Sequence, residues 1–333
     1  MGKYFYPIVG GLLLIASLFS LYYGIKAYQL GDLPENVEGY AHQSYHFLLV
    51  SQEIENPYWA KVYAGAKEAA DRENIYIEYK GPVQTDIEEH LRILERGIAE
   101  RVDGIITQGL NAEAFTPVIN KAVEAGIPVI TIDTDAPHSK RIAYVGTYNY
   151  RAGRQAGQEM IRLTGGTGKV GIVTGSLEAT NMIERVQGFK DALAASPNLH
   201  IVAVESSNIS RIYASEKTDQ ILRDHPDITA LYGTSALDGP GMAEVVKRRG
   251  LSGKITILSF DDLEETLAYI KEGVITATVA QNPIRMGSES ILLMKKLLEG
   301  KAIPTLNLTD TLILRKENLT EDRTTQSMEN KSR

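Results

Sequence analysis

The feature that most constrains the fold of this chain is a regular alternation of short apolar runs with longer amphipathic segments. From Tyr45 onward, runs of about five residues rich in Val, Ile and Thr alternate with helix-like segments of about 12 to 17 residues. Parallel strands need a long crossover between them, usually a helix. The alternation therefore predicts βαβ units, parallel sheets and an α/β fold.

This alternation occurs twice along the chain. The first series has predicted strands at 45–50, 75–79, 104–108, 127–132 and 142–146, with helices at 59–74, 86–101 and 113–125. A longer helix, 148–163, and a glycine-rich loop, 164–168, lead into the second series. Its strands are predicted at 169–173, 201–205, 230–233, 255–260 and 276–280, with helices at 182–195, 212–224, 241–249, 263–271 and 284–298. We expect two lobes, each a small sheet with helices on both faces, which agrees with a length of 333 residues.

The composition and the missing motifs exclude several function classes. The net charge of −7 and the pI near 5.5 argue against nucleic-acid binding, because nucleic-acid-binding domains are normally basic. The chain has no cysteine and no Gly-x-Ser-x-Gly motif, so it lacks two common nucleophiles. The run 165–170 resembles a phosphate-binding loop, but the first glycine and the final Ser or Thr are missing and a strand follows. We therefore expect neither an enzyme nor a cofactor.

The histidines also predict no catalytic or metal site. His42 and His46 have the spacing of two metal ligands on a helix, but no third ligand is near and a strand is predicted from Tyr45. The histidines at positions 90, 138, 200 and 225 show no pairing with a carboxylate or a serine, and we expect them to be solvated.

The N-terminal segment 4–25 contains no charged residue and is long enough to cross about 30 Å of hydrocarbon as a helix. It is longer than the apolar region of a cleaved signal peptide, and the residues after it make a poor cleavage site. Without a cysteine, a lipid anchor is impossible. We interpret residues 1–30 as an uncleaved anchor, with cleavage as the alternative. The protein is then a single-pass protein of a bacterial cell membrane with its C-terminal domain outside. Residues 31–44 are predicted to form a linker and residues 316–333 a disordered tail.

Polar residues occur at the ends of several predicted strands. Asn56, Tyr58 and Trp59 follow the first strand, and Asp133, Ser235, Asp261 and Gln281 follow four later ones. Arg185, on a predicted helix, is a further candidate. Each of these residues also has an ordinary structural interpretation: the aspartates could cap helices, the aromatics could pack in the core, and Arg185 could be a solvated charge. Because ligands of α/β folds bind beyond the carboxyl ends of the strands, the set together predicts a cleft lined with donors and acceptors. Such groups beside aromatic faces suit a sugar.

The ordered set of motifs resembles the type I periplasmic binding proteins of the ribose- and galactose-binding kind. The matching pieces are Asn-Pro-Tyr-Trp at 56–59, Gly-Ile-Pro-Val-Ile-Thr-Ile-Asp at 126–133, Arg-Val-Gln-Gly-Phe at 185–189, Ser-Phe-Asp at 259–261 and Thr-Ala-Thr-Val-Ala-Gln at 276–281. The resemblance implies two Rossmann-like lobes joined by a three-segment hinge that close on one sugar. The first lobe would comprise 45–147 with 282–306, and the second 148–281 with 307–315.

The resemblance also implies a role for each site residue. Asn56 would bond sugar hydroxyls, Tyr58 or Trp59 would stack on the ring, and Asp133 would accept from two hydroxyls. Arg185 would donate two hydrogen bonds, and Asp261 and Gln281 would hold the sugar from the second lobe and the hinge. Three positions depart from the ribose-binding pattern: Thr134 replaces an Arg, Ser235 an Asn and Ile209 an aromatic residue. The expected ligand is therefore a pentose or hexose other than ribose.

Two functions are compatible with this sequence. The protein could deliver the sugar to the permease of an ABC transporter, or it could report the sugar to a histidine kinase as a membrane-anchored sensor. The related DNA-binding regulators begin with a helix-turn-helix, and a membrane-type segment occupies that place here.

Overall fold

The computed structural model describes residues 14, 16–23 and 44–319, and Leu14 and residues 16–23 are helical. The chain divides into a unit that ends at Gln43 and a compact unit that begins at Ser44. No helix of the described residues is both long enough and apolar enough to cross a membrane. Most of the predicted anchor at 4–25, the predicted linker apart from Ser44, and residues 320–333 of the predicted tail lie outside the described residues.

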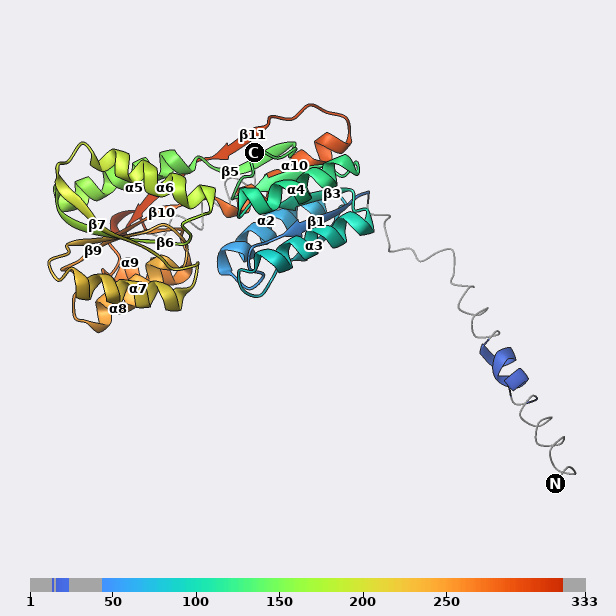
Figure 1. The fold of residues 1–333 in the computed structure, drawn as a ribbon, viewed down its shortest axis with the longest axis horizontal. Helices are drawn as coiled ribbons and strands as arrows, with labels where there is room; N and C mark the ends of the chain where they lie inside the picture. The colour runs from blue at the N-terminus through green and yellow to red at the C-terminus, as the bar shows by residue number, and fades with distance from the viewer. Residues whose placement is uncertain (1–13, 15, 24–43, 320–333) are drawn as a thin grey trace, which may run out of the picture. The chain divides into compact units, whose positions relative to one another are not determined.

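The unit from Ser44 onward contains two α/β lobes, each with a six-stranded sheet (Figure 1). The first sheet is parallel throughout, with the strand order β11-β5-β4-β3-β1-β2. Its strands are β1 (His46–Val50), β2 (Tyr76–Lys80), β3 (Gly104–Thr107), β4 (Val129–Ile132), β5 (Ala143–Thr147) and β11 (Leu306–Thr309). Its helices are α2 (Pro57–Arg72), α3 (Ile87–Glu100), α4 (Ala112–Glu124) and α10 (Pro283–Leu298).

The second sheet has the order β12-β10-β9-β8-β6-β7 and is parallel except for its edge strand β12. Its strands are β6 (Thr167–Thr174), β7 (Asn198–Ser206), β8 (Ala230–Gly233), β9 (Thr256–Phe260), β10 (Ala277–Ala280) and β12 (Leu312–Arg315). Its helices are α5 (Asn149–Thr164), α6 (Thr180–Leu193), α7 (Arg211–Asp224), α8 (Asp238–Arg248) and α9 (Glu264–Glu272), and a 3₁₀ turn, Lys316–Asn318, follows β12.

Each sheet is covered on both faces, and this explains why its central strands are apolar at successive positions. In β1, Phe47 and Leu49 pack with residues of α2 and α10, whereas Leu48 and Val50 pack with residues of α3 and α4. Successive side chains of a strand point to opposite faces, so one apolar run supplies two cores. The second lobe repeats this plan, with α5 and α6 on one face and α7, α8 and α9 on the other.

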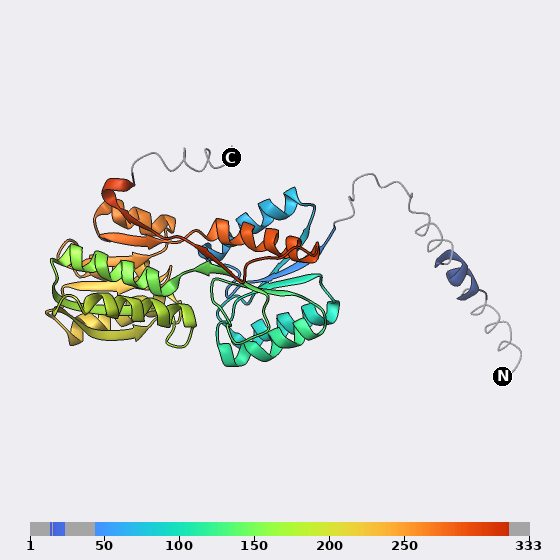
Figure 2. The ribbon, with the colours of Figure 1, turned by 90° about the horizontal axis from the view of Figure 1, so that it is seen from above.

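The chain passes between the lobes three times, at Tyr148, at 281–282 and at 310–311. After the second crossing the chain returns to the first lobe, where α10 packs beside α2 (Figure 2). The third differs from the sequence prediction, which ended the first lobe at 306. Leu306 to Thr309 pair with Tyr144 to Thr147 of β5, so the chain leaves the first sheet only after Thr309. The tail predicted from residue 316 begins with the short 3₁₀ turn.

Candidate functional site

Two aspartates occupy equivalent positions in the two lobes. Asp133 follows β4 and Asp261 follows β9, and both have a left-handed backbone, with φ of 64° and 67°. The backbone N–H of Asp133 donates to Val145 and that of Asp261 to Val279, each on the neighbouring strand, over 2.9 and 2.8 Å. Left-handed residues other than glycine are uncommon, and such strain gathers at functional sites. The geometry turns each carboxylate beyond the end of its sheet.

The carboxylate of Asp133 accepts hydrogen bonds from both lobes. The Tyr58 hydroxyl donates to Oδ1 over 2.7 Å, and the amide of Gln108 donates to Oδ2 over 3.1 Å. The Thr134 hydroxyl also donates to Oδ2, over 3.1 Å. The Asn181 amide comes from α6 in the second lobe and donates to the same oxygen over 3.3 Å. Asp133 is thus a point of direct contact between the lobes.

Arg185 is buried inside the protein, with only 1% of its surface exposed. Its Nε donates to Asn149 Oδ1 over 2.9 Å, and its two terminal nitrogens donate to the Thr234 carbonyl over 2.8 Å and to Gln281 Oε1 over 3.0 Å. The guanidinium also stacks on the ring of Phe260, 3.9 Å from its centroid. A guanidinium has five N–H groups, and Nη1 also donates to the Met182 sulfur over 4.0 Å, so one N–H group has no partner among the described residues.

Gln281 connects the hinge to Asp261. Its Oε1 accepts from the Thr147 hydroxyl over 2.6 Å, across two of the crossings between lobes, and its Nε2 donates to Asp261 Oδ1 over 2.9 Å. Burial raises the pKa of Asp261 to about 7, against the lowering effects of Arg185 and of the Gln281 hydrogen bond. The protonation of Asp261 therefore changes near neutral pH.

The residues after β1 have structural roles and also face the site. The Asn56 side chain caps α2 by accepting from the backbone N–H of Tyr58 over 3.0 Å, and its amide donates to Glu53 Oε2 over 3.0 Å. Tyr58 and Trp59 meet edge to face, with ring centroids 5.7 Å apart. Burial and the nearby carboxylate of Asp133 raise the pKa of the Tyr58 hydroxyl well above its ordinary value. Tyr58 therefore remains a hydrogen-bond donor at neutral pH.

All eight residues singled out in the sequence line one hollow between the lobes. It is lined by Gln52, Asn56, Tyr58, Trp59, Asp133, Met182, Arg185, Ile209, Ser235, Ala236, Asp261 and Gln281. Its volume is about 30 Å³, enough for about two water molecules. This space is smaller than a sugar ring, so the side chains that now bond to one another, or the lobes, must shift before a sugar binds.

Residues 47–302 match the family model described as a periplasmic binding protein domain. The chain belongs to this family. It is a family of binding proteins and not of enzymes, and it is extracytoplasmic. The predicted resemblance and the prediction that the protein is not an enzyme are confirmed.

Three proteins of known name are similar to this chain. A glucose-galactose binding protein, GanP from Geobacillus stearothermophilus, has 48% identity and a TM-score of 0.81, over 83% of this chain and 99% of GanP. The solved XylFII-LytSN complex includes a chain with 38% identity and a TM-score of 0.79, covering 82% of this chain and 98% of the other. The D-ribose/D-allose-binding protein of Pseudomonas aeruginosa is 28% identical over 263 residues, which are 76% of this chain and 82% of the relative.

Several residues of this periplasmic binding protein's site were not found from the sequence. Gln108 follows β3 as Asp133 follows β4, so the strand-end rule applies to it equally. Asn181 donates to Asp133, and Gln52, Met182 and Ala236 line the hollow, although none of these four was singled out in the sequence. Among the predicted residues, Ser235 has a buried hydroxyl with no hydrogen-bond partner in the described part of the chain, and its backbone N–H donates to Asp238 Oδ2 over 2.8 Å.

The prediction that His90 is solvated is wrong. His90 is fully buried, its Nε2 lies 2.9 Å from the Thr107 hydroxyl, and its ring meets Phe115 edge to face. Burial lowers the pKa of His90 to about 3, so the ring is neutral and forms part of the core. His46 lies 3.1 Å from Glu78 Oε2, and no metal-binding cluster of His, Cys, Asp or Glu occurs in the described ranges.

Proposed function

We propose that this protein binds one monosaccharide, a pentose or hexose, outside the cytoplasm and presents it to the permease of an ABC transporter. The observation that carries this proposal is the hollow enclosed by Asp133, Arg185, Asp261 and Gln281 beside the ring of Trp59. Carboxylates, a guanidinium and an amide satisfy sugar hydroxyls, which both donate and accept, and the charged groups form the stronger bonds. Relatives named for sugar binding support the same ligand class.

In this proposal the sugar takes over bonds that the site residues now make to one another. Its hydroxyls would donate to Asp133 in place of Asn181 and to Asp261 in place of Gln281, and one would accept from the remaining N–H group of Arg185. The Ser235 hydroxyl would gain its missing partner. These groups come from both lobes, so the sugar binds the closed arrangement more tightly than the open one. The difference between the two binding free energies is the amount by which the sugar stabilises closure.

The second candidate function is sugar sensing at the membrane. The relative XylFII was solved in complex with LytSN, so a protein of this fold binds another protein. A histidine kinase as partner and residues 4–25 as a single-pass anchor would make this chain such a sensor. The two functions separate in cells: deleting a transport protein abolishes sugar uptake, whereas deleting a sensor abolishes sugar-induced transcription and leaves basal uptake in place. Membrane fractionation of the tagged full-length chain tests the anchor.

A thermal-shift screen with pentoses, hexoses and polyols tests the ligand class. A bound sugar adds RT ln(1 + [L]/Kd) to stability, about 2.7 kcal/mol at a hundredfold excess over Kd. We expect at least one monosaccharide to raise the melting temperature and ribose to be a weak ligand. If no member of the panel moves the melting temperature, sugar binding is rejected.

The variant Asp133→Asn tests the site itself. Asn keeps the shape of the side chain and tolerates the left-handed backbone, but it removes the charge and one acceptor. A hydrogen bond to a charged group contributes about 1.5–3 kcal/mol, so the sugar Kd should rise at least about tenfold. Isothermal titration calorimetry measures this, with Asp227→Asn, an exposed residue paired with Lys169, as the matched control. Equal affinity for Asp133→Asn and wild type would place the sugar elsewhere.

A further inference from the structure

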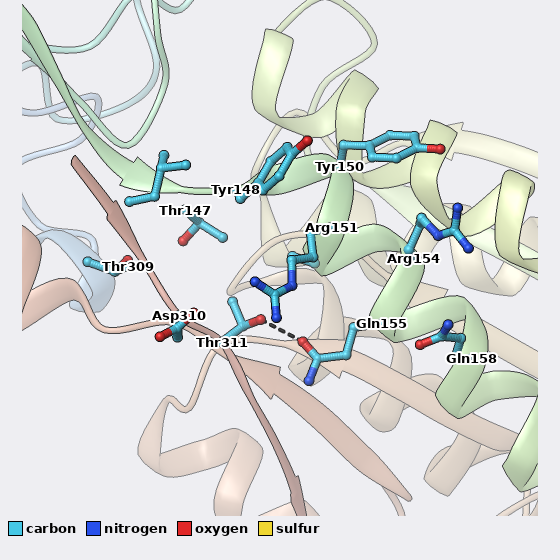
Figure 3. Close-up of a pocket in the computed structure, with 12 residues that line it drawn as sticks. Thr147, Tyr148, Tyr150, Arg151, Arg154, Gln155, Gln158, Thr309, Asp310 and Thr311 are labelled. Atoms are coloured by element: carbon cyan, nitrogen blue, oxygen red, sulfur yellow. Dashed lines mark hydrogen bonds between the residues drawn. The ribbon is translucent and has the colours of Figure 1, made fainter. Parts of the chain in front are cut away.

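A second and larger hollow lies at the hinge, with a volume of about 580 Å³ (Figure 3). Its walls are the start of α5 and the segment that passes from β11 to β12. It shares no lining residue with the hollow that contains Asp133 and Asp261. Ligand sites have volumes of about 300–1,000 Å³, so this hollow is large enough for a small molecule.

The wall of this hinge pocket carries hydrogen-bond donors without partners. Within the described residues, neither Arg151 nor Arg154 makes a hydrogen bond or an ion pair, and both are exposed on α5. Figure 3 shows the Arg151 guanidinium directed into the space between Tyr148 and Thr311, with Arg154 farther along the helix. The Thr311 hydroxyl donates to Gln155 Oε1 over 2.6 Å, which leaves the amide nitrogen of Gln155 free to donate to a ligand.

The charge around the pocket is positive. Two arginines line it against one carboxylate, Asp310, and the first turn of α5 contains no acidic residue. The positive end of the helix dipole adds to the charge of Arg151 in that turn. Unpaired guanidinium groups surrounded by amide and hydroxyl donors suit a ligand rich in acceptors and negatively charged, such as a carboxylate or phosphate.

The pocket is connected to both lobes and to the candidate sugar site. Thr147 and Thr309 belong to the first sheet, α5 packs on the second, and Thr311 lies in a crossing. Thr147 donates to Gln281, which in turn donates to Asp261. A ligand that contacts the walls from both lobes would have a different affinity for each arrangement of the lobes, which is the requirement for coupling to a second site.

We propose that the hinge pocket binds a small carboxylate- or phosphate-bearing molecule through Arg151, with Arg154 contributing charge, and that its occupancy changes the affinity for sugar. The coupling rests on the proposed function; the anion binding does not.

The first experiment titrates the full-length protein, without sugar, with citrate and with inorganic phosphate by calorimetry, which also distinguishes the two anion classes. We expect binding of at least one anion, lost in Arg151→Gln and weakened in Arg154→Gln. The matched control is Arg96→Gln, an exposed arginine of α3 that likewise has no partner within the described residues. Melting temperatures show whether each variant is folded. Absence of binding by both anions, or equal binding by Arg151→Gln and Arg96→Gln, overturns the site.

The second experiment measures the sugar Kd with and without the anion. Coupling predicts a change of at least about fivefold, the low end of typical allosteric effects, and an equal change in the anion Kd when sugar is present. An unchanged sugar Kd with a bound anion overturns the coupling and leaves the site. A protein that binds anion but no sugar would contradict only the proposed function.

Discussion

The most informative single residue is Asp261, whose raised pKa links stability to pH. Its pKa in the folded protein is about 7, above the ordinary 3.8, so the folded state holds the proton more tightly than the unfolded chain. The stabilisation from this group is complete below pH about 4 and is lost as the pH rises through about 7. We predict that Asp261→Asn flattens this part of the stability profile, as measured by urea unfolding of wild type and variant from pH 4 to pH 8. Parallel profiles for the two proteins would contradict the prediction.

At the residue scale, the sequence could predict which side chains lie together at the site but not which contacts they make with one another. Parallel strands end at one edge of a sheet, so the polar residues after the strands had to meet. The sequence does not reveal that Arg185 is buried among Asn149, Thr234 and Gln281, because an arginine on an amphipathic helix is usually exposed. The same reasoning failed for His90, whose burial depends on the packing of α3 on β3 and α4.

At the scale of elements, each lobe contains one pair of helices that meet through glycines. In the first lobe, a Cβ at Gly287 of α10 would lie 1.9 Å from the carbonyl oxygen of Val62 in α2. In the second lobe, a Cβ at Gly188 of α6 would lie 2.1 Å from the carbonyl oxygen of Tyr150 in α5. These helices position the site, because α6 carries Asn181 and Arg185 and both α5 and α10 begin at a crossing. Side chains larger than hydrogen would force the helices apart.

We predict that Gly188→Ala destabilises the protein by about 1–3 kcal/mol, the usual cost of overpacking, although alanine is the better helix former. It should also weaken sugar binding, because Arg185 moves with α6. Urea unfolding and calorimetry measure the two effects. The neighbouring control Gln187→Ala, at an exposed position bonded only to Asp191 among the described residues, should change stability by less than about 0.5 kcal/mol. A Gly188→Ala protein as stable as this control would mean that the helices can separate freely.

The bounds of the helices and of the central strands of each sheet were predictable to within a few residues, because long periodic segments leave few alternatives. The exceptions are β11 and β12, which have four residues each and alternate too briefly to be recognised. Their assignment to different sheets depends on pairing with β5 and β10, which are distant in sequence. This explains why the last crossing was placed about three residues too early.

At the scale of the whole binding unit, a few polar bridges hold the lobes together across the hollow. Asn181 reaches Asp133, and the Asn111 amide lies 3.4 Å from Glu178 Oε2. The Lys61 ammonium, on α2, donates to the carbonyl oxygen of Asp262 over 2.9 Å and to its carboxylate over 2.8 Å. Bridges of this kind favour the closed arrangement, and their loss should appear in both shape and affinity.

We therefore predict that Lys61→Met, which keeps the apolar stem and removes the charge, enlarges the radius of gyration without sugar, as measured by small-angle X-ray scattering. A partly exposed ion pair contributes at most about 1 kcal/mol, so the sugar Kd should rise about two- to fivefold. At saturating sugar, variant and wild type should have the same radius. The control is Lys67→Met on the same helix, whose partner Asp71 lies within α2, so it should change neither quantity. If Lys61→Met also changes neither, the bridge persists equally in the open and closed arrangements and does not favour closure.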